Sequence, residues 1–181
     1  MQEYMNASVL ILAISWLLAG IFAMALKHKV GAWPRFIASL TAYDIVPERL
    51  VKLAGALLVV SELAAVLLLF SGQPLGLWFA TLLLSVYAMA IAINVLRGKW
   101  HIDCGCGDEP TPVSWFLFWR NTLLVMMAQF GLVLHATGLT WTLLVALIAL
   151  GLSLIALGIY VAVEQLMANR GRHQRLWLGA V

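Results

Sequence analysis

The chain has 181 residues, of which 64% are hydrophobic and only 10% are charged. A water-soluble domain of this length could not bury so much apolar surface in one core, so most of the surface must face lipid. The eleven Lys and Arg residues lie in short clusters beside apolar runs and form no separate basic domain, which argues against a nucleic-acid partner. A single membrane domain over residues 1–181 is therefore predicted.

Five apolar runs are long enough to cross the roughly 30 Å hydrocarbon core of a bilayer, for which about 20 residues suffice. The runs are Met5–Leu26, Leu50–Phe70, Leu75–Leu96, Trp115–Ala136 and Thr140–Val163. They predict an all-α, polytopic helical bundle. Because no basic residue precedes the first run, we expect a retained signal anchor, with cleavage at the small-x-small sequence Ala23-Met24-Ala25 as the alternative.

Three polar segments connect or follow these spans. In residues 34–46, Phe36, Ile37, Leu40 and Tyr43 recur at helical spacing, which predicts a short amphipathic helix at the membrane surface, closed by Pro47. Residues 97–114 form a loop that contains both cysteines, and residues 164–181 form a basic C-terminal tail.

The basic residues all fall on one side of the predicted bundle, in the first and third connections, the adjoining turns and the tail. They are Lys27, Lys29, Arg35, Arg49, Lys52, Arg97, Lys99, Arg120, Arg170, Arg172 and Arg175. The positive-inside rule then predicts a bacterial inner-membrane protein with a cytoplasmic cysteine loop and an external N-terminus. Among the tryptophans, only Trp16 is expected in mid-span.

Cys104 and Cys106 are separated by one residue. Such a pair can close a small disulfide ring only if the backbone bends sharply, which Gly105 permits. A strained ring exchanges readily with other thiols, so we favour thiol–disulfide exchange with a partner protein. No bound cofactor is predicted.

Two other interpretations of the loop stay open. His101, Asp103, Cys104 and Cys106 supply four metal donors, although their spacing is tighter than that of usual zinc sites. Alternatively, the cysteines form a purely structural bridge or two idle thiols.

Glu62 lies near the middle of the second span, where a carboxylate is costly and should face the bundle interior. It could act as a proton relay or pair with a basic group, or it could be a protonated structural residue bonded to a neighbour such as Asn94. Arg120 and Asn121 lie one turn inside the fourth span. We expect Arg120 to snorkel to the surface, with folding over the cysteine loop as the alternative.

Two sequence blocks resemble a known family. The first contains Lys27-x-Lys29, then Trp33-Pro34-x-Phe36, and then the helix with Glu62, and it is similar to DoxX-like membrane proteins. The second, His101-Ile-Asp-Cys-Gly-Cys-Gly followed by Trp119-Arg120-Asn121, resembles the MauE branch, the methylamine utilisation family. The similarity extends from about residue 5 to residue 163.

This resemblance implies a role in amine metabolism, namely maturation of the disulfide-rich small subunit of methylamine dehydrogenase together with a thioredoxin-like, MauD-like partner. It implies Cys104 and Cys106 as the thiol pair, supported by Glu62, Arg120 and Asn121. The alternatives are a metal-handling transporter or chaperone that uses the same loop, and a noncatalytic membrane scaffold.

The implied client folds in the periplasm, whereas the charge rule places the cysteine loop in the cytoplasm. Either electrons from a cytoplasmic thiol donor cross the bundle, or the orientation inferred from charge is wrong.

Overall fold

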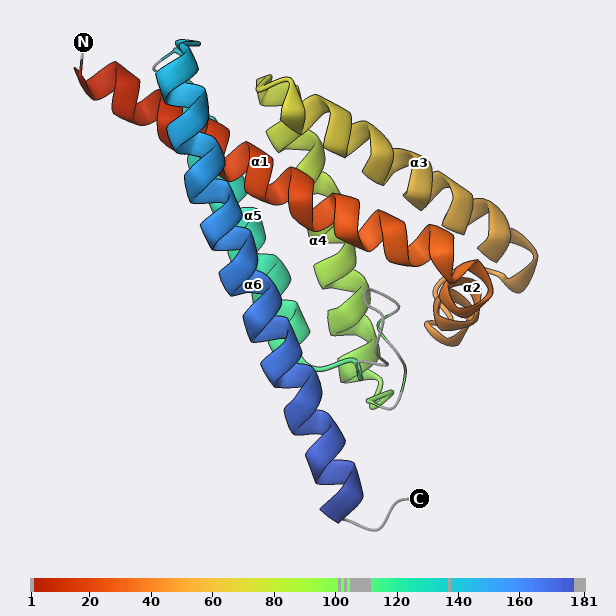
Figure 1. Ribbon diagram of the computed structural model, residues 1–181. Coiled ribbons are helices and arrows are strands. Elements are labelled where there is room, and N and C mark those ends of the chain that lie inside the picture. The colour runs from red at the N-terminus through yellow and green to blue at the C-terminus, as the bar shows by residue number, and fades with distance from the viewer. Residues whose placement is uncertain (1, 101, 103, 105–111, 137, 178–181) are drawn as a thin grey trace.

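A computed structural model describes the chain except for residues 1, 101, 103, 105–111, 137 and 178–181. The described residues form six α-helices and one short 3-10 helix (Figure 1). In chain order these are α1 (Gln2–Gly31), α2 (Trp33–Ala42), η1 (Glu48–Leu50), α3 (Val51–Phe70), α4 (Pro74–Leu96), α5 (Trp115–His135) and α6 (Leu143–Trp177).

Five of the helices are long and apolar enough to cross a membrane, which confirms the predicted polytopic all-α bundle. Their membrane-spanning segments are Tyr4–Gly31, Glu48–Phe70, Pro74–Leu96, Trp115–His135 and Leu143–Met167. Large apolar side chains such as Leu67 and Val133 are exposed on the helix surfaces, as lipid contact requires.

Two helices are longer than the apolar runs that predicted them. α1 continues past Leu26 to Gly31, and α6 begins at Leu143 and continues to Trp177 through the segment predicted as a tail. No proline interrupts the sequence from Leu143 to Trp177, and several residues after Val163 are strong helix formers, so the helix continues where the hydrophobicity falls.

α1 runs obliquely through the bundle and packs against α3, α5 and α6, while α4 and α5 pack against each other (Figure 1). Trp16, which the sequence places in mid-span, lies near the middle of the candidate span Tyr4–Gly31 and contacts two other elements. Its ring lies 6.2 Å from that of Trp141, centroid to centroid, and its Nε1–H donates to the carbonyl oxygen of Phe70 at 3.5 Å. Trp16 therefore lies beside the end of α3 and the start of α6.

The turn between α3 and α4 brings two backbones into close contact. Gly72 adopts φ +68°, which glycine tolerates without strain, and Pro74 begins α4. A Cβ atom added at Gly76 would lie 2.7 Å from the backbone carbonyl carbon of Leu68. Because backbone atoms cannot move aside as a flexible side chain can, this position accepts only glycine.

We predict that Gly76→Ala lowers the unfolding free energy by about 1–3 kcal/mol or more, because the added methyl group forces α3 and α4 apart. Thermal unfolding of the detergent-solubilised protein measures the effect. Gly158→Ala is the matched control, since nothing lies within 4 Å of a Cβ atom there. Equal stability of the two variants would contradict the close approach of α3 and α4.

Candidate functional site

A charged cluster lies inside the bundle where α1, α3 and α4 meet. The Lys29 ammonium, in the last turn of α1, forms an ion pair and hydrogen bond with Oε1 of Glu62 on α3. The Tyr87 hydroxyl, on α4, donates to the same oxygen at 2.6 Å. The side chains of Lys29 and Glu62 are 4% and 0% exposed, so the pair is fully enclosed by protein.

Aromatic rings surround the Lys29 ammonium. The nitrogen lies 4.8 Å from the ring centroid of Tyr87 and 5.5 Å from that of Phe36 on α2, and the Tyr87 hydroxyl is 3.3 Å away. Ring faces attract cations, and this attraction is stronger where water is excluded. Lys29 therefore has partners besides Glu62.

This position corrects one expectation from sequence. The apolar run ends at Leu26 and so predicts Lys29 in a basic loop after the first span. Lys29 is instead helical and buried, because α1 continues past the apolar run and Glu62 supplies a counterion. Tyr87 was not anticipated at all. The signal that could have found it was the same one that drew attention to Glu62, a polar group near the middle of an apolar span.

Glu62 faces the bundle interior and pairs with a basic group, as one of the two interpretations proposed. Among the described residues, its hydrogen-bond partners are Lys29 and Tyr87, not Asn94. The Asn94 amide instead donates to the carbonyl oxygen of Ala90 at 3.0 Å, and its own Oδ1 is buried without a partner among the described residues.

Arg120 neither snorkels to the surface nor is bound by the described part of the cysteine loop. Its guanidinium forms an ion pair with Glu164 on α6 at 2.8 Å, and the Arg120 side chain is only 13% exposed. The sequence did not suggest Glu164, because it was assigned to the tail. Asn121 is 3% exposed and donates to the carbonyl oxygen of Leu117 at 2.9 Å, so it belongs to the packed interior of α5.

Cys104 lies in the segment between α4 and α5, at one end of the bundle. It is disulfide-bonded and 9% exposed. An apolar cluster encloses it, formed by Tyr43, Ile91, Val95, Ile102, Val113 and Leu117. A backbone hydrogen bond of 2.9 Å from the Val113 N–H to the Ile102 carbonyl closes the base of the loop. The other predicted loop residues, His101, Asp103, Gly105 and Cys106, lie outside the described residues.

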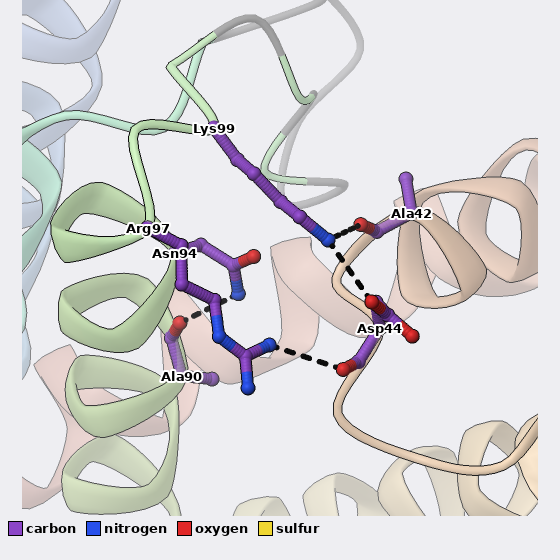
Figure 2. A network of polar contacts seen from close by, with 6 residues as sticks. All are labelled: Ala42, Asp44, Ala90, Asn94, Arg97 and Lys99. Atoms are coloured by element: carbon purple, nitrogen blue, oxygen red, sulfur yellow. Dashed lines mark hydrogen bonds and ion pairs between the residues drawn. The ribbon is translucent and has the colours of Figure 1, made fainter.

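A polar network ties this loop base to the segment that follows α2 (Figure 2). The Lys99 ammonium lies 3.3 Å from the Asp44 carboxylate and 3.5 Å from the Ala42 carbonyl oxygen, and Arg97 donates to the Asp44 carbonyl oxygen at 3.1 Å. Asp44 adopts φ +51°, which turns the chain after α2 toward these cations. These contacts fix the end of α2 beside the loop.

The fold and these two sites define a polytopic α-helical membrane protein with an ion pair in its interior and a disulfide-bonded cysteine at one end. The sequence profile of the methylamine utilisation protein MauE matches residues 7–134. The chain belongs to this MauE family, as the resemblance predicted.

Relatives in three bacteria support this assignment. The methylamine utilization protein MauE of Paracoccus denitrificans is 33% identical over 133 residues, and that of Paracoccus versutus is 32% identical over 132 residues. In both cases the alignment covers 71% of each chain. The MauE protein of Methylophilus methylotrophus is 34% identical over 116 residues, covering 63% of this chain and 61% of its own. No solved structure matches the chain.

We predict that Lys29→Met lowers the unfolding free energy by about 3–5 kcal/mol, because it leaves the Glu62 charge buried without its cation. Adding Glu62→Leu in the same chain should restore part of the loss. Unfolding of the two single variants and the double variant in detergent forms a double-mutant cycle.

Lys27→Met serves as the control, since Lys27 is exposed on the same helix. Additive losses in the cycle would show that Lys29 and Glu62 do not stabilise the bundle as a pair.

Proposed function

We propose that this protein is a membrane thiol–disulfide exchange component of the methylamine utilisation system, acting through Cys104 and Cys106. The observation that carries the proposal is the disulfide-bonded state of Cys104 in the segment between α4 and α5, at one end of the bundle. A sulfur already in a disulfide is the group that a partner's thiolate attacks.

The burial of Cys104 suggests the order of exchange. An incoming thiolate has little access to a sulfur that is 9% exposed, so we expect attack on Cys106. The partner's sulfur bonds to the Cys106 sulfur, the Cys104–Cys106 bond breaks, and Cys104 leaves as a thiolate that takes a proton. A second thiolate of the partner then releases Cys106, so that the partner is oxidised and the pair is reduced.

The partner that fits this chemistry is a thioredoxin-like, MauD-like protein, and the client is the disulfide-rich small subunit of methylamine dehydrogenase. The relatives' names place them in methylamine utilisation, which supports this client. Glu62, Arg120 and Asn121 have supporting roles in this proposal. Glu62 binds Tyr87 on α4 and Arg120 joins α5 to α6, so these two residues hold the helices that flank the loop. Asn121 packs within α5 itself.

The metal-handling alternative has less support. A cysteine in a disulfide offers no thiolate to a metal ion, so Cys104 would first have to be reduced. His101, Asp103 and Cys106, the other candidate ligands, lie outside the described residues. A noncatalytic scaffold would need neither cysteine.

We further propose the orientation that the basic residues indicate, with α2 and the loop in the cytoplasm. The α1–α3 connection, the segment between α4 and α5 and the C-terminal end of α6 lie at the same end of the bundle (Figure 1). This arrangement supports placing all three on the same side of the membrane. A periplasmic client then requires electrons from a cytoplasmic thiol donor to cross the bundle.

The exchange mechanism predicts opposite behaviour of two cysteine variants incubated with oxidised glutathione. Cys104→Ser should accumulate one glutathione adduct at Cys106, because no second thiol displaces it. Cys106→Ser should form its adduct roughly tenfold more slowly, because Cys104 is buried. Intact-protein mass spectrometry measures both, and the reduced wild type should return to the internal disulfide.

Failure of both variants to react would contradict the exchange function. Stoichiometric zinc or copper in the wild type that is lost in Cys104→Ser would favour the metal alternative. Normal client maturation with both cysteines replaced by serine would favour the scaffold.

The orientation predicts the side from which single cysteines are labelled in a background without Cys104 and Cys106. Glu48→Cys, at the α2 end, should react with a membrane-impermeant maleimide only in inside-out vesicles. Gln73→Cys, in the α3–α4 turn, should react only in right-side-out vesicles. Both positions are exposed, and neither substitution removes a basic residue. The reverse pattern would show that the loop faces the periplasm.

A further inference from the structure

The apolar cluster that contains Cys104 draws its members from two parts of the chain. Most of the buried members belong to α4, to α5 or to the segment between these helices, namely Ile91, Val95, Ile102, Val113 and Leu117. The exception among the described residues is Tyr43, which directly follows the ten-residue helix α2 and is 8% exposed. Tyr43 is thus the one described member that can leave the cluster while α4, α5 and the segment between them keep their positions.

The residues on both sides of Tyr43 are held by two cations that follow α4 (Figure 2). The Lys99 ammonium lies 3.5 Å from the Ala42 carbonyl oxygen and 3.3 Å from the Asp44 carboxylate. Arg97 donates to the Asp44 carbonyl oxygen at 3.1 Å. These contacts fix the backbone before and after Tyr43, and so they keep its side chain in the cluster.

We propose that Tyr43 shields the Cys104 sulfur from thiols, that Asp44 holds Tyr43 in this position, and that Cys106 is therefore the sulfur that a partner attacks. The inference rests on the proposed exchange function and assigns its selectivity to a residue outside the loop. In disulfide exchange, a thiolate must reach one sulfur while the other sulfur leaves. The cluster that Tyr43 completes leaves Cys104 only 9% exposed, which closes the approach to this sulfur.

Access to each sulfur can be measured in the reverse direction with single-cysteine variants. The thiolate of the remaining cysteine attacks oxidised glutathione, and its sulfur bonds to one glutathione sulfur. The glutathione disulfide breaks, and the second glutathione leaves as a thiolate that takes a proton. Because both directions pass through the same arrangement of sulfur atoms, a residue that blocks attack on Cys104 also slows attack by Cys104.

The contacts that hold Tyr43 are open to water. The side chains of Lys99 and Asp44 are 29% and 80% exposed, and an exposed ion pair contributes little to stability. Loss of the Asp44 charge should therefore raise the reactivity of Cys104 by no more than about fivefold. Loss of the Tyr43 ring removes the shield itself.

Reaction of the full-length protein in detergent with oxidised glutathione tests the inference. In the Cys106→Ser background, Tyr43→Ala should speed adduct formation at Cys104 by about threefold to tenfold, because the sulfur becomes exposed. In the Cys104→Ser background, the same substitution should leave the rate at Cys106 unchanged. Intact-protein mass spectrometry measures both rates, and detergent makes both ends of the bundle accessible.

The outcomes separate this inference from the exchange function. An unchanged rate at Cys104 in Tyr43→Ala would overturn the shielding role, while fast reaction at Cys106 would leave the exchange function intact. An equal increase at both cysteines would also overturn it, because the substitution would then loosen the whole end of the bundle. Absence of an adduct at Cys106 in every variant would overturn the exchange function and the selectivity with it.

Matched variants keep the test decisive if Tyr43→Ala does not fold. Asp44→Asn keeps Tyr43 and suits the positive φ of this position, and it should raise the rate at Cys104 measurably, within the fivefold limit. Tyr43→Phe should retain the slow rate because it retains the ring. Ile45→Ala, at a residue that is 44% exposed in the same segment, should change neither rate. A rate at Cys104 that Asp44→Asn does not change would overturn the role of Asp44.

Discussion

The ion pair between Lys29 and Glu62 is the interaction on which the arrangement of the bundle most depends. In lipid, apolar helix faces gain little from contacting one another, because the lipid tails are equally apolar. Polar contacts and close backbone packing must therefore select how the helices associate. The pair joins α1 to α3, and Tyr87 adds α4 through the same carboxylate oxygen. Three helices are thus fixed at one point, where any displacement would leave a charge in an apolar interior.

α2 lies between this interior cluster and the cysteine loop. Phe36 on α2 places its ring beside the Lys29 ammonium, and α2 also packs against α3 close to Gly55, where a Cβ atom would lie 2.7 Å from Ile37. Directly after α2, Tyr43 packs in the cluster that contains Cys104, and Asp44 binds the base of the loop through Arg97 and Lys99 (Figure 2). A ten-residue helix and the turn after it therefore contact both sites.

The sequence predicted the spans well because the bilayer imposes one simple requirement, an apolar run long enough to cross it. Hydropathy carries no information on tilt, however, so the position of Trp16 beside Trp141 could not be predicted. Nor does it reveal which charge near a helix end turns inward. Lys27 and Lys29 are equivalent by composition, yet only Lys29 faces Glu62, because two residues along a helix differ by about 200° in direction.

For the candidate site, the sequence identified Glu62 as an unusual carboxylate but not its partners, because Lys29 and Tyr87 lie 33 and 25 residues away from it along the chain. Asn121 stands out in the sequence as a polar residue in a span. Its side-chain amide donates a hydrogen bond to the Leu117 carbonyl oxygen in the same helix. A sequence pattern does not distinguish such a local hydrogen bond from a functional role. The loop cysteines were recognisable from their spacing alone. The apolar surroundings of Cys104 depend on Tyr43 and Ile91, which come from other elements.

α6 shows why the family match does not describe a complete bundle. The match covers residues 7–134 and ends before this helix begins. Arg120, which lies within the match, has its ion-pair partner Glu164 on α6. Without α6, a guanidinium that is 13% exposed would lose its carboxylate in a largely apolar setting, at a cost that no other described ion pair would offset. The last helix therefore supplies the counterion of Arg120, which lies on α5, the helix that begins directly after the cysteine loop.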